Sequence, residues 1–300
     1  MKTYALMGMY SQENQLAEFL TYYLRILQFD QVIFVERFFD EKMQPSLSKS
    51  ICRLFGERVI YDAIISPGDG VKAQVEFQHI LVKKWLAYLR TIHPPSEHDS
   101  VWVLYVDCDE FVRFPGSIAT LIEKIKPAPD TGIGFVQSLF GHNDLEKMGW
   151  DELVIETHPM SVTLDLDDPW YSCKVSTLLK ENWPRNDWAH KTMYPLSSQV
   201  KHWLHNSGQI THLLCPTTIA GINHYMILSK ELINRTHPGG TVQKKMREMI
   251  AEDLRETGRQ NNSMSLAHFS GSIREDQRYQ ASLPLLTGVF GPRNATIVQV

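Results

Sequence analysis

The chain has 300 residues, 43% of them hydrophobic, which is enough to build one large domain or two small ones around a substantial core. Its formal net charge of −4 argues against the basic surface of a general nucleic-acid-binding protein, so no nucleic-acid partner is expected. A negatively charged substrate would then need a bound metal or helix amino termini beside it.

The targeting features of the sequence indicate the cytoplasm. The apolar stretch at residues 4–9 is too short for a signal peptide, and no segment approaches the roughly 20 apolar residues of a membrane span. The four cysteines are scattered without metal-site or redox spacing. We expect a cytoplasmic protein with reduced cysteines. Association with a membrane surface or a larger complex stays open.

Strand and helix patterns alternate in the first half of the chain. Short β-prone runs predict strands, and apolar residues three and four apart predict helices. Their alternation predicts βαβ units, a parallel sheet, and helices on both of its faces. The expected elements are a strand at 4–9, a helix at 11–27, a strand at 31–35, a helix at 45–55, a strand at 58–65, a helix at 71–91, a strand at 101–106, a helix at 117–126 and a strand at 132–139.

The second half of the chain is less regular. Residues 141–220 mix short apolar runs with Trp, His, Pro and Asn, and residues 243–257 are expected to form a late helix. A composition shift near residue 115 divides the chain into two halves. We expect both halves to share one continuous sheet, in a single domain that spans residues 1–300.

The most informative stretch is an apolar run, residues 101–106, that leads directly into Asp107, Cys108, Asp109 and Glu110. Such a run is typical of a strand buried on both faces of a parallel sheet, and ligands bind outside the carboxyl ends of these strands. The carboxylates are not expected in the core, because an ionised group is not buried without a partner. Residues i and i+2 of a strand point the same way, so Asp107 and Asp109 could bind one divalent cation that bridges to a diphosphate.

Two alternatives to this metal site stay open. The acids could simply be solvated in a turn at the end of the strand. A second acidic cluster, Asp165, Asp167 and Asp168, is a competing metal site, but it lacks a long buried strand before it.

Three motifs, in order, resemble those of one glycosyltransferase group. Trp102-x-x-x-Val106-Asp107-Cys108-Asp109-Glu110-Phe111 is similar to the W-x(3)-[IV]-D-x-D-E-F signature of the family 92 enzymes and the related family 2-like transferases. Phe140-Gly141-His142 resembles their F-G-[HS] segment. Ile222-Asn223-His224-Tyr225 with Ser229-Lys230-Glu231 resembles their I-x-H-Y-x(3)-S-x-E-x-[FW] block. The resemblance covers residues 3–235 and implies an α/β protein of the GT-A fold, a Rossmann-like mixed sheet flanked by helices.

This sequence departs from the family pattern at three places. Ile233 stands where an aromatic residue is expected, and residues 11–14 stand where relatives have Lys-Asn-Glu. Residues 36–40 replace an Asp-Asn-x-Ser-x-Asp turn after the second strand, which leaves the recognition of sugar and base open.

The expected metal is Mn²⁺ or Mg²⁺, held by Asp107, Asp109 and His224. A small apolar run, residues 217–222, delivers His224 to a strand end, and a neutral imidazole beside carboxylates suits Mn²⁺ better than Mg²⁺. The resemblance points to the same histidine. The alternative is a histidine that is satisfied by backbone groups near the surface.

A nucleotide-sugar donor and a glycan acceptor are the expected partners. Tyr10, Gln12 and Glu13 follow the first strand, where a nucleobase can stack and form hydrogen bonds. Gln78 is included because relatives also tend to carry a Gln before the acidic motif, and Asp107 is expected on the ribose or the metal. Residues 1–115 would then bind the donor, and residues 116–300, with a C-terminal helical segment, would bind the acceptor.

An inverting transfer needs a carboxylate near the acceptor hydroxyl as general base. The candidates in the second half are Asp144, Asp151, Glu152 and Glu156, and Asp151 is preferred because it follows Trp150, whose ring could stack on a sugar. Glu152 is the second choice. A retaining transfer would not require this base, and the sequence leaves the stereochemistry open.

The leading hypothesis is a metal-dependent glycosyltransferase, a hexosyl- or pentosyltransferase that uses a UDP- or GDP-linked sugar. One alternative is another metal-dependent nucleotide enzyme, such as a nucleotidyltransferase, although the chain lacks a Gly-rich basic loop near the first strand. A second alternative is a non-catalytic carbohydrate-binding protein. Such a protein would need no metal for a diphosphate.

Overall fold

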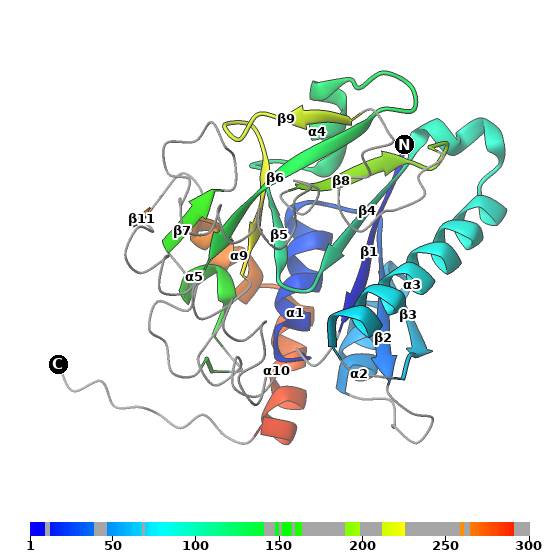
Figure 1. Ribbon diagram of the computed structural model, residues 1–300. Helices are drawn as coiled ribbons and strands as arrows, with labels where there is room; N and C mark the ends of the chain where they lie inside the picture. Colours follow the sequence, from blue (N-terminus) through cyan, green and yellow to red (C-terminus); the bar gives the residue numbers. More distant parts are fainter. Residues whose placement is uncertain are drawn as a thin grey trace.

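The computed structural model describes residues 1–9, 13–38, 47–67, 70–140, 148–149, 152–157, 160–163, 190–198, 212–225, 259–260 and 265–290. Within them, four parallel strands form one side of a sheet, in the order β3-β2-β1-β4 (Figure 1). These strands are β1 (Lys2–Met9), β2 (Gln31–Phe38), β3 (Val59–Ile65) and β4 (Val101–Asp107). Gly8 pairs with both Val35 and Asp107, so the carboxyl ends of three strands lie at the same edge.

The other side of the sheet is mixed rather than parallel. β8 lies antiparallel between β4 and β6, and it thereby joins strands from the two halves of the chain. The sequence of residues 141–220 has no alternating pattern of predicted strands and helices, so nothing in it demands the parallel pairing of βαβ units. The strands are β5 (Glu110–Arg113), β6 (Gly132–Phe140), β7 (Met160–Thr163), β8 (His190–Pro195), β9 (His212–Cys215), β10 (Gly221–His224) and β11 (Arg259–Gln260).

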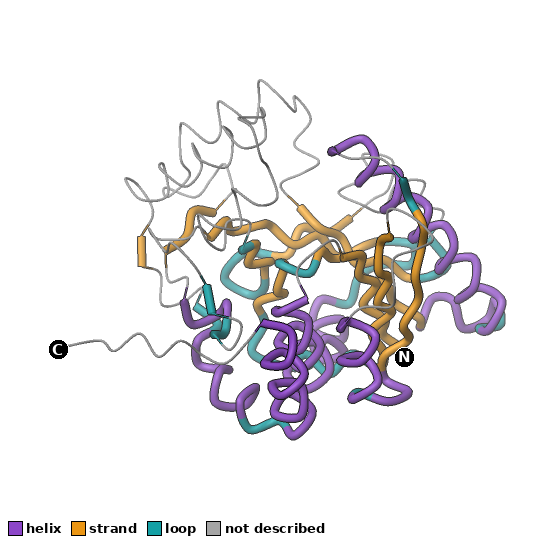
Figure 2. Tube along the Cα trace, turned by 90° about the horizontal axis from the view of Figure 1, so that it is seen from below, coloured by secondary structure: helices purple, strands orange, loops and turns teal. Residues whose placement is uncertain are grey.

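Helices cover both faces of this sheet (Figure 2). One face packs against α1 (Glu13–Thr21), the π turn η1 (Tyr22–Ile26), α2 (Leu47–Leu54), α4 (Ile118–Ile125), α5 (Val154–Thr157), α9 (Ser270–Arg274) and α10 (Gln277–Phe290). The opposite face packs against the long helix α3 (Gly70–Ile92). Short 3₁₀ turns are η2 (Gly56–Arg58), η3 (Pro95–Ser100) and η5 (Ala267–Phe269). The expected fold class, an α/β protein with a mixed sheet flanked by helices, is confirmed.

The alternation of β4 decides where its acidic end points. Leu104 and Val106 lie in the hydrophobic cluster on the α1 side, whereas Val103 and Tyr105 lie in the cluster on the α3 side. Every residue from 101 to 106 is buried, as the sequence predicted for a central strand. Asp107 has the same parity as Tyr105, so its side chain faces α3.

Most of the expected elements of the first half are present, with small shifts at their ends. The hydroxyl of Ser117 accepts a hydrogen bond from the backbone N–H of Thr120 and caps α4, as an N-cap residue should. The helix expected to reach Leu27 is α-helical only to Thr21, because it continues as the π turn. The helix expected at 243–257 lies outside the described residues. Among the described helices, none combines the length and the apolar character required to cross a bilayer.

Candidate active site

A two-residue turn at the end of β4 separates the acids of the motif. β4 ends at Asp107, Cys108 and Asp109 form the turn, and β5 begins at Glu110. β5 pairs antiparallel with β10, which places His224 opposite Glu110. The backbone N–H of Tyr225 donates to the carbonyl of Asp109 at 2.8 Å. The turn and the end of β10 are therefore fixed together by backbone hydrogen bonds.

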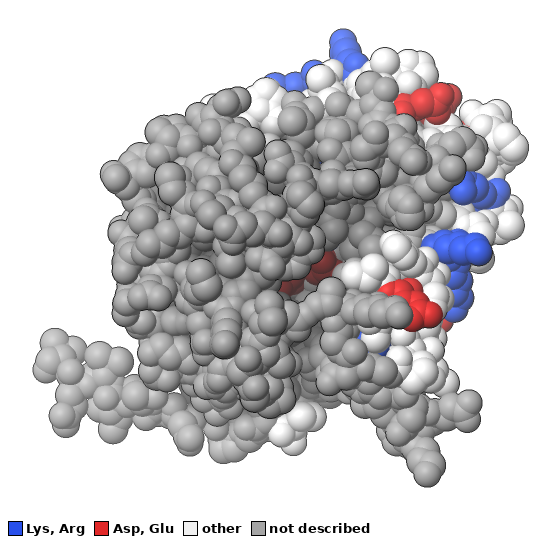
Figure 3. All heavy atoms as spheres, in the orientation of Figure 1, with Lys and Arg blue, Asp and Glu red and all other residues white. Residues whose placement is uncertain are grey.

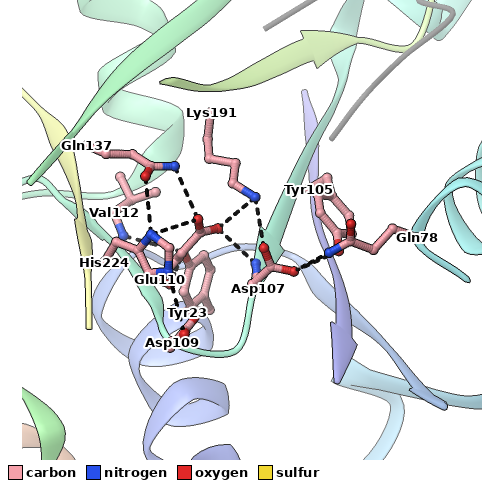
Figure 4. A network of polar contacts seen from close by, with 10 residues as sticks. All are labelled: Tyr23, Gln78, Tyr105, Asp107, Asp109, Glu110, Val112, Gln137, Lys191 and His224. Atoms are coloured by element: carbon pink, nitrogen blue, oxygen red, sulfur yellow. Dashed lines mark hydrogen bonds and ion pairs between the residues drawn. The ribbon is translucent and has the colours of Figure 1, made fainter. Parts of the chain in front are cut away.

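Asp107 is held by side chains from two other elements (Figure 4). Its Oδ1 accepts hydrogen bonds from Gln78 Nε2 of α3 at 3.0 Å and from the Tyr105 hydroxyl at 2.8 Å. Its Oδ2 accepts one from Lys191 Nζ of β8 at 3.0 Å. Burial, together with the charge of Asp107, raises the pKa of Tyr105 well above its usual value, so the phenol stays a donor. The position of Asp107 is thus strongly fixed.

Glu110 is in the core, which corrects the expectation that all three acids lie outside it. Glu110 is fully buried. Its Oε2 lies 3.1 Å from Lys191 Nζ and accepts a hydrogen bond from the backbone N–H of Asp107 at 2.9 Å. Its Oε1 accepts from Gln137 Nε2 of β6 at 3.3 Å. The sequence argument failed here because the partners of Glu110 lie far away in the chain.

Lys191 is the cation that makes this burial possible, and sequence reasoning missed it. Its side chain is 1% exposed and lies between Asp107 and Glu110. Burial alone would lower the pKa of Lys191, but the two carboxylates outweigh burial and raise its pKa above the usual value. Lys191 therefore carries a charge. The only signal in the sequence is a lysine within the short run 190–195.

Asp109 and His224 form a pair beside this network, and His224 Nδ1 lies 3.7 Å from Glu110 Oε1. His224 Nε2 lies 3.5 Å from Asp109 Oδ2. Asp109 Oδ1 is buried, and no hydrogen-bond partner for it is found among the described residues. Burial alone would lower the pKa of His224, but Asp109 outweighs burial and raises it. An orphaned buried carboxylate oxygen beside an imidazole nitrogen fits the donor set of a divalent cation, since metal bonds of about 2.1 Å place neighbouring ligand atoms roughly 3–4 Å apart.

The three expected metal ligands do not form one ready cluster. Within the described part of the chain, no group of three or more His, Cys, Asp and Glu residues is arranged to hold a metal ion. Asp107 faces α3 and Lys191, whereas Asp109 faces β10 (Figure 4). Metal binding by Asp109 and His224 stays a prediction, as does the role of Asp107 as a metal ligand or a ribose ligand.

The remaining expected site residues have different outcomes. Gln78 is buried and contacts Asp107, so it is not an exposed helix residue. Glu152 lies outside this network, and its Oε2 accepts the backbone N–H of Gly149 at 2.6 Å. Glu156 forms an ion pair with Arg274 on the surface. The described residues do not include Tyr10, Gln12, Asp144, Asp151, Asp165, Asp167 and Asp168, and they include Glu13 only as the first residue of α1.

A hollow in one face of the molecule contains acidic atoms. Figure 3 shows Asp or Glu atoms at the base of this hollow, near the middle of the face that is seen in Figure 1.

Gln137 is the second residue of the network around Asp107 and Glu110 that sequence reasoning missed. It lies within the buried strand β6, and the only signal in the sequence is a polar residue in a largely apolar run.

Comparison with known proteins gives structural neighbours only. No family model and no curated protein matches the chain. A glycosyltransferase involved in the glycosylation of the major capsid of PBCV-1 aligns with 83% of this chain and 99% of its own length, at 10% identity and a TM-score of 0.27. TarS of S. aureus aligns with 96% of this chain, at 10% identity and a TM-score of 0.34, and the chain spans 49% of its length. Mouse xyloside xylosyltransferase 1 aligns with 66% of this chain and 68% of its own, at 12% identity and a TM-score of 0.27. Similarity at this level leaves the chemistry to be argued from the residues of this chain.

Proposed function

We propose that this protein is a metal-dependent glycosyltransferase that moves a sugar from a UDP- or GDP-linked donor to a glycan hydroxyl. The observation that carries the proposal is the pair formed by Asp109 and His224 at the end of β4. It combines a buried carboxylate oxygen, for which the described part of the chain offers no partner, with an imidazole nitrogen 3.5 Å from the other oxygen. The motif resemblance assigns a metal to the same two residues.

Asp109 and His224 would hold Mn²⁺ or Mg²⁺, and Mn²⁺ is the better match for a ligand set that includes imidazole. A bound cation would neutralise the diphosphate of the donor and favour its departure. Asp107 has a different task in this proposal. Gln78, Tyr105 and Lys191 hold its carboxylate in one orientation, where it can accept a hydrogen bond from a ribose hydroxyl or join the metal shell.

The acceptor side of the reaction is assigned to the second half of the chain. In an inverting transfer the acceptor oxygen attacks the anomeric carbon from the face opposite to the leaving diphosphate, so its proton is removed on the side away from Asp109. Asp151 is the proposed base, with Glu152 as the second candidate. Tyr10, Gln12 and Glu13 are proposed to contact the base of the donor, and the cytoplasmic location stays a prediction.

A panel of nucleotide sugars tests the proposal, with Mn²⁺ present or removed by chelation. We expect the protein to release a nucleoside diphosphate from at least one donor, and we expect this activity to require the metal. The Asp109→Asn variant should keep the fold and lose most of the activity. Cys108→Ala is the matched control, because Cys108 is the adjacent residue but packs into the hydrophobic cluster on the α1 side. Release of pyrophosphate instead would indicate a nucleotidyltransferase, and full activity of Asp109→Asn would remove the proposed metal site.

A further inference from the structure

Gln137 connects the buried charge network to His224. It lies on β6 and is 2% exposed. Its Nε2 is 3.3 Å from Glu110 Oε1, and its Oε1 is 3.2 Å from His224 Nδ1 (Figure 4). The side chain thus uses both ends of its amide, one toward an acid and one toward the imidazole.

The partners of Glu110 decide which way this amide points. Glu110 Oε2 accepts the backbone N–H of Asp107 and lies 3.1 Å from Lys191 Nζ. Burial raises the pKa of Glu110 to about 7 and Lys191 opposes this rise, and in its ionised form the carboxylate can only accept hydrogen bonds. The amide of Gln137 must therefore present its NH₂ group to Glu110. Its carbonyl oxygen then faces His224, and this oxygen also can only accept.

The orientation of the amide in turn places a proton on the imidazole. His224 must donate to Gln137 Oε1, so Nδ1 carries a hydrogen. A neutral imidazole with its proton on Nδ1 has its lone pair on Nε2. Nε2 is the atom that lies 3.5 Å from Asp109 Oδ2. In the neutral imidazole this lone pair would face the Asp109 carboxylate, whose buried Oδ1 has no hydrogen-bond partner among the described residues.

We propose that Gln137 is a positioning residue that fixes the tautomer of His224, so that Nε2 can bind the divalent cation beside Asp109. This inference rests on the proposed metal site and adds to it a chain of polar contacts that runs from Lys191 through Glu110 and Gln137 to His224. Such buried partners of a metal-binding histidine orient the ring and set which nitrogen is free. Glu110 serves in this arrangement as an anchor rather than as a metal ligand.

Direct binding of Mn²⁺ tests the inference without any assay of activity. Free Mn²⁺ can be followed by its electron paramagnetic resonance signal in titrations of the wild type and of Gln137→Met, which keeps the length of the side chain but removes the acceptor. Loss of a buried partner of this kind weakens metal binding by about 10- to 100-fold. Gln31→Met is the matched control. Gln31 lies at the amino end of β2, away from the site at the carboxyl ends of the strands, and its side chain donates to the carbonyl of Glu57.

The outcomes separate this inference from the proposed function. If the wild type does not bind Mn²⁺, or if His224→Ala binds it as well as the wild type does, the metal site itself is wrong. If the wild type and Gln137→Met bind Mn²⁺ equally well while His224→Ala binds weakly, only the role of Gln137 is wrong. Should Gln137→Met fail to fold, ¹⁵N-histidine NMR of the wild type with diamagnetic Zn²⁺ gives the same answer. A proton on Nδ1 of His224 supports the inference, and a proton on Nε2 overturns it.

Discussion

A buried carboxyl on α1 predicts an unusual dependence of stability on pH. Glu18 is 2% exposed, and its two oxygens accept the backbone N–H groups of Val154 and Ile155 at 2.9 and 3.2 Å. These bonds tie α1 to α5. Burial raises the pKa of Glu18 to about 8 from its usual 4.5, although the two N–H donors oppose the shift.

The sign and the size of the effect follow from this difference between the folded and the unfolded chain. Between pH 4.5 and pH 8 the folded state keeps the proton that the unfolded state loses, so the folded state binds more protons and the free energy of unfolding falls as the pH rises. The contribution is fully present below pH 4.5 and is lost by pH 8. A difference of about 3.5 pKa units corresponds to at most about 5 kcal/mol.

Urea denaturation of the wild type and of Glu18→Gln, at pH 5, 6.5 and 8, measures this contribution. The amide cannot ionise, so the stability of the wild type relative to the variant should fall by several kcal/mol from pH 5 to pH 8. Glu76→Gln removes one carboxylate at an exposed position of α3 and serves as the control for the loss of a single negative charge. A difference between wild type and Glu18→Gln that is constant, or that grows with pH, would show that Glu18 is ionised in the folded state and refute the reasoning.

Three further predictions concern the site. His224→Ala should raise the Mn²⁺ concentration needed for half-maximal activity, and an unchanged metal titration would indicate a structural histidine. Asp151→Asn should bind the donor normally but turn over about 10²- to 10⁴-fold more slowly. Product NMR that shows a retained anomeric configuration, or full activity of this variant, would remove Asp151 from the role of base. Lys191→Met should lower the free energy of unfolding by about 3–5 kcal/mol in urea titrations, because Glu110 stays buried without its cation. A loss below about 1 kcal/mol would show that the network is not held by this pair.

The sequence was sufficient for the parallel half of the sheet and for the location of the acidic motif. In β4, the layers that cover both faces of the strand are apolar, so the uninterrupted run 101–106 identified a central strand without knowledge of its partners. The carboxyl end of this strand was therefore expected at the edge of the sheet where ligands bind. Gln78 contacts Asp107, a contact that the sequence did not reveal, and its role in donor binding stays a prediction.

The sequence was not sufficient where the structure depends on distant pairing. Lys191 reaches Glu110 only because β8 inserts antiparallel between β4 and β6, and local patterns do not reveal such an insertion. The helices α9 and α10 were missed for a different reason. Pro284 lies inside α10, where a proline removes a backbone hydrogen bond and normally predicts the end of a helix. Packing of Tyr279 and Leu286 into the core stabilises the helix regardless.

The acidic motif itself shows how a turn can divide the roles of two neighbouring acids. Strand periodicity would have placed Asp107 and Asp109 on one side, but the strand ends between them, so the rule of i and i+2 no longer holds. Asp107 keeps the direction of Tyr105, and its two oxygens accept hydrogen bonds from three side chains. Asp109 is turned toward β10, and one of its buried oxygens has no partner within the residues that the structure describes. A carboxylate that already accepts three hydrogen bonds is held in one orientation and has little capacity left for a cation, whereas the Asp109 oxygen is suited to bind one. The asymmetry of the motif is therefore what makes Asp109, rather than Asp107, the first candidate for the metal.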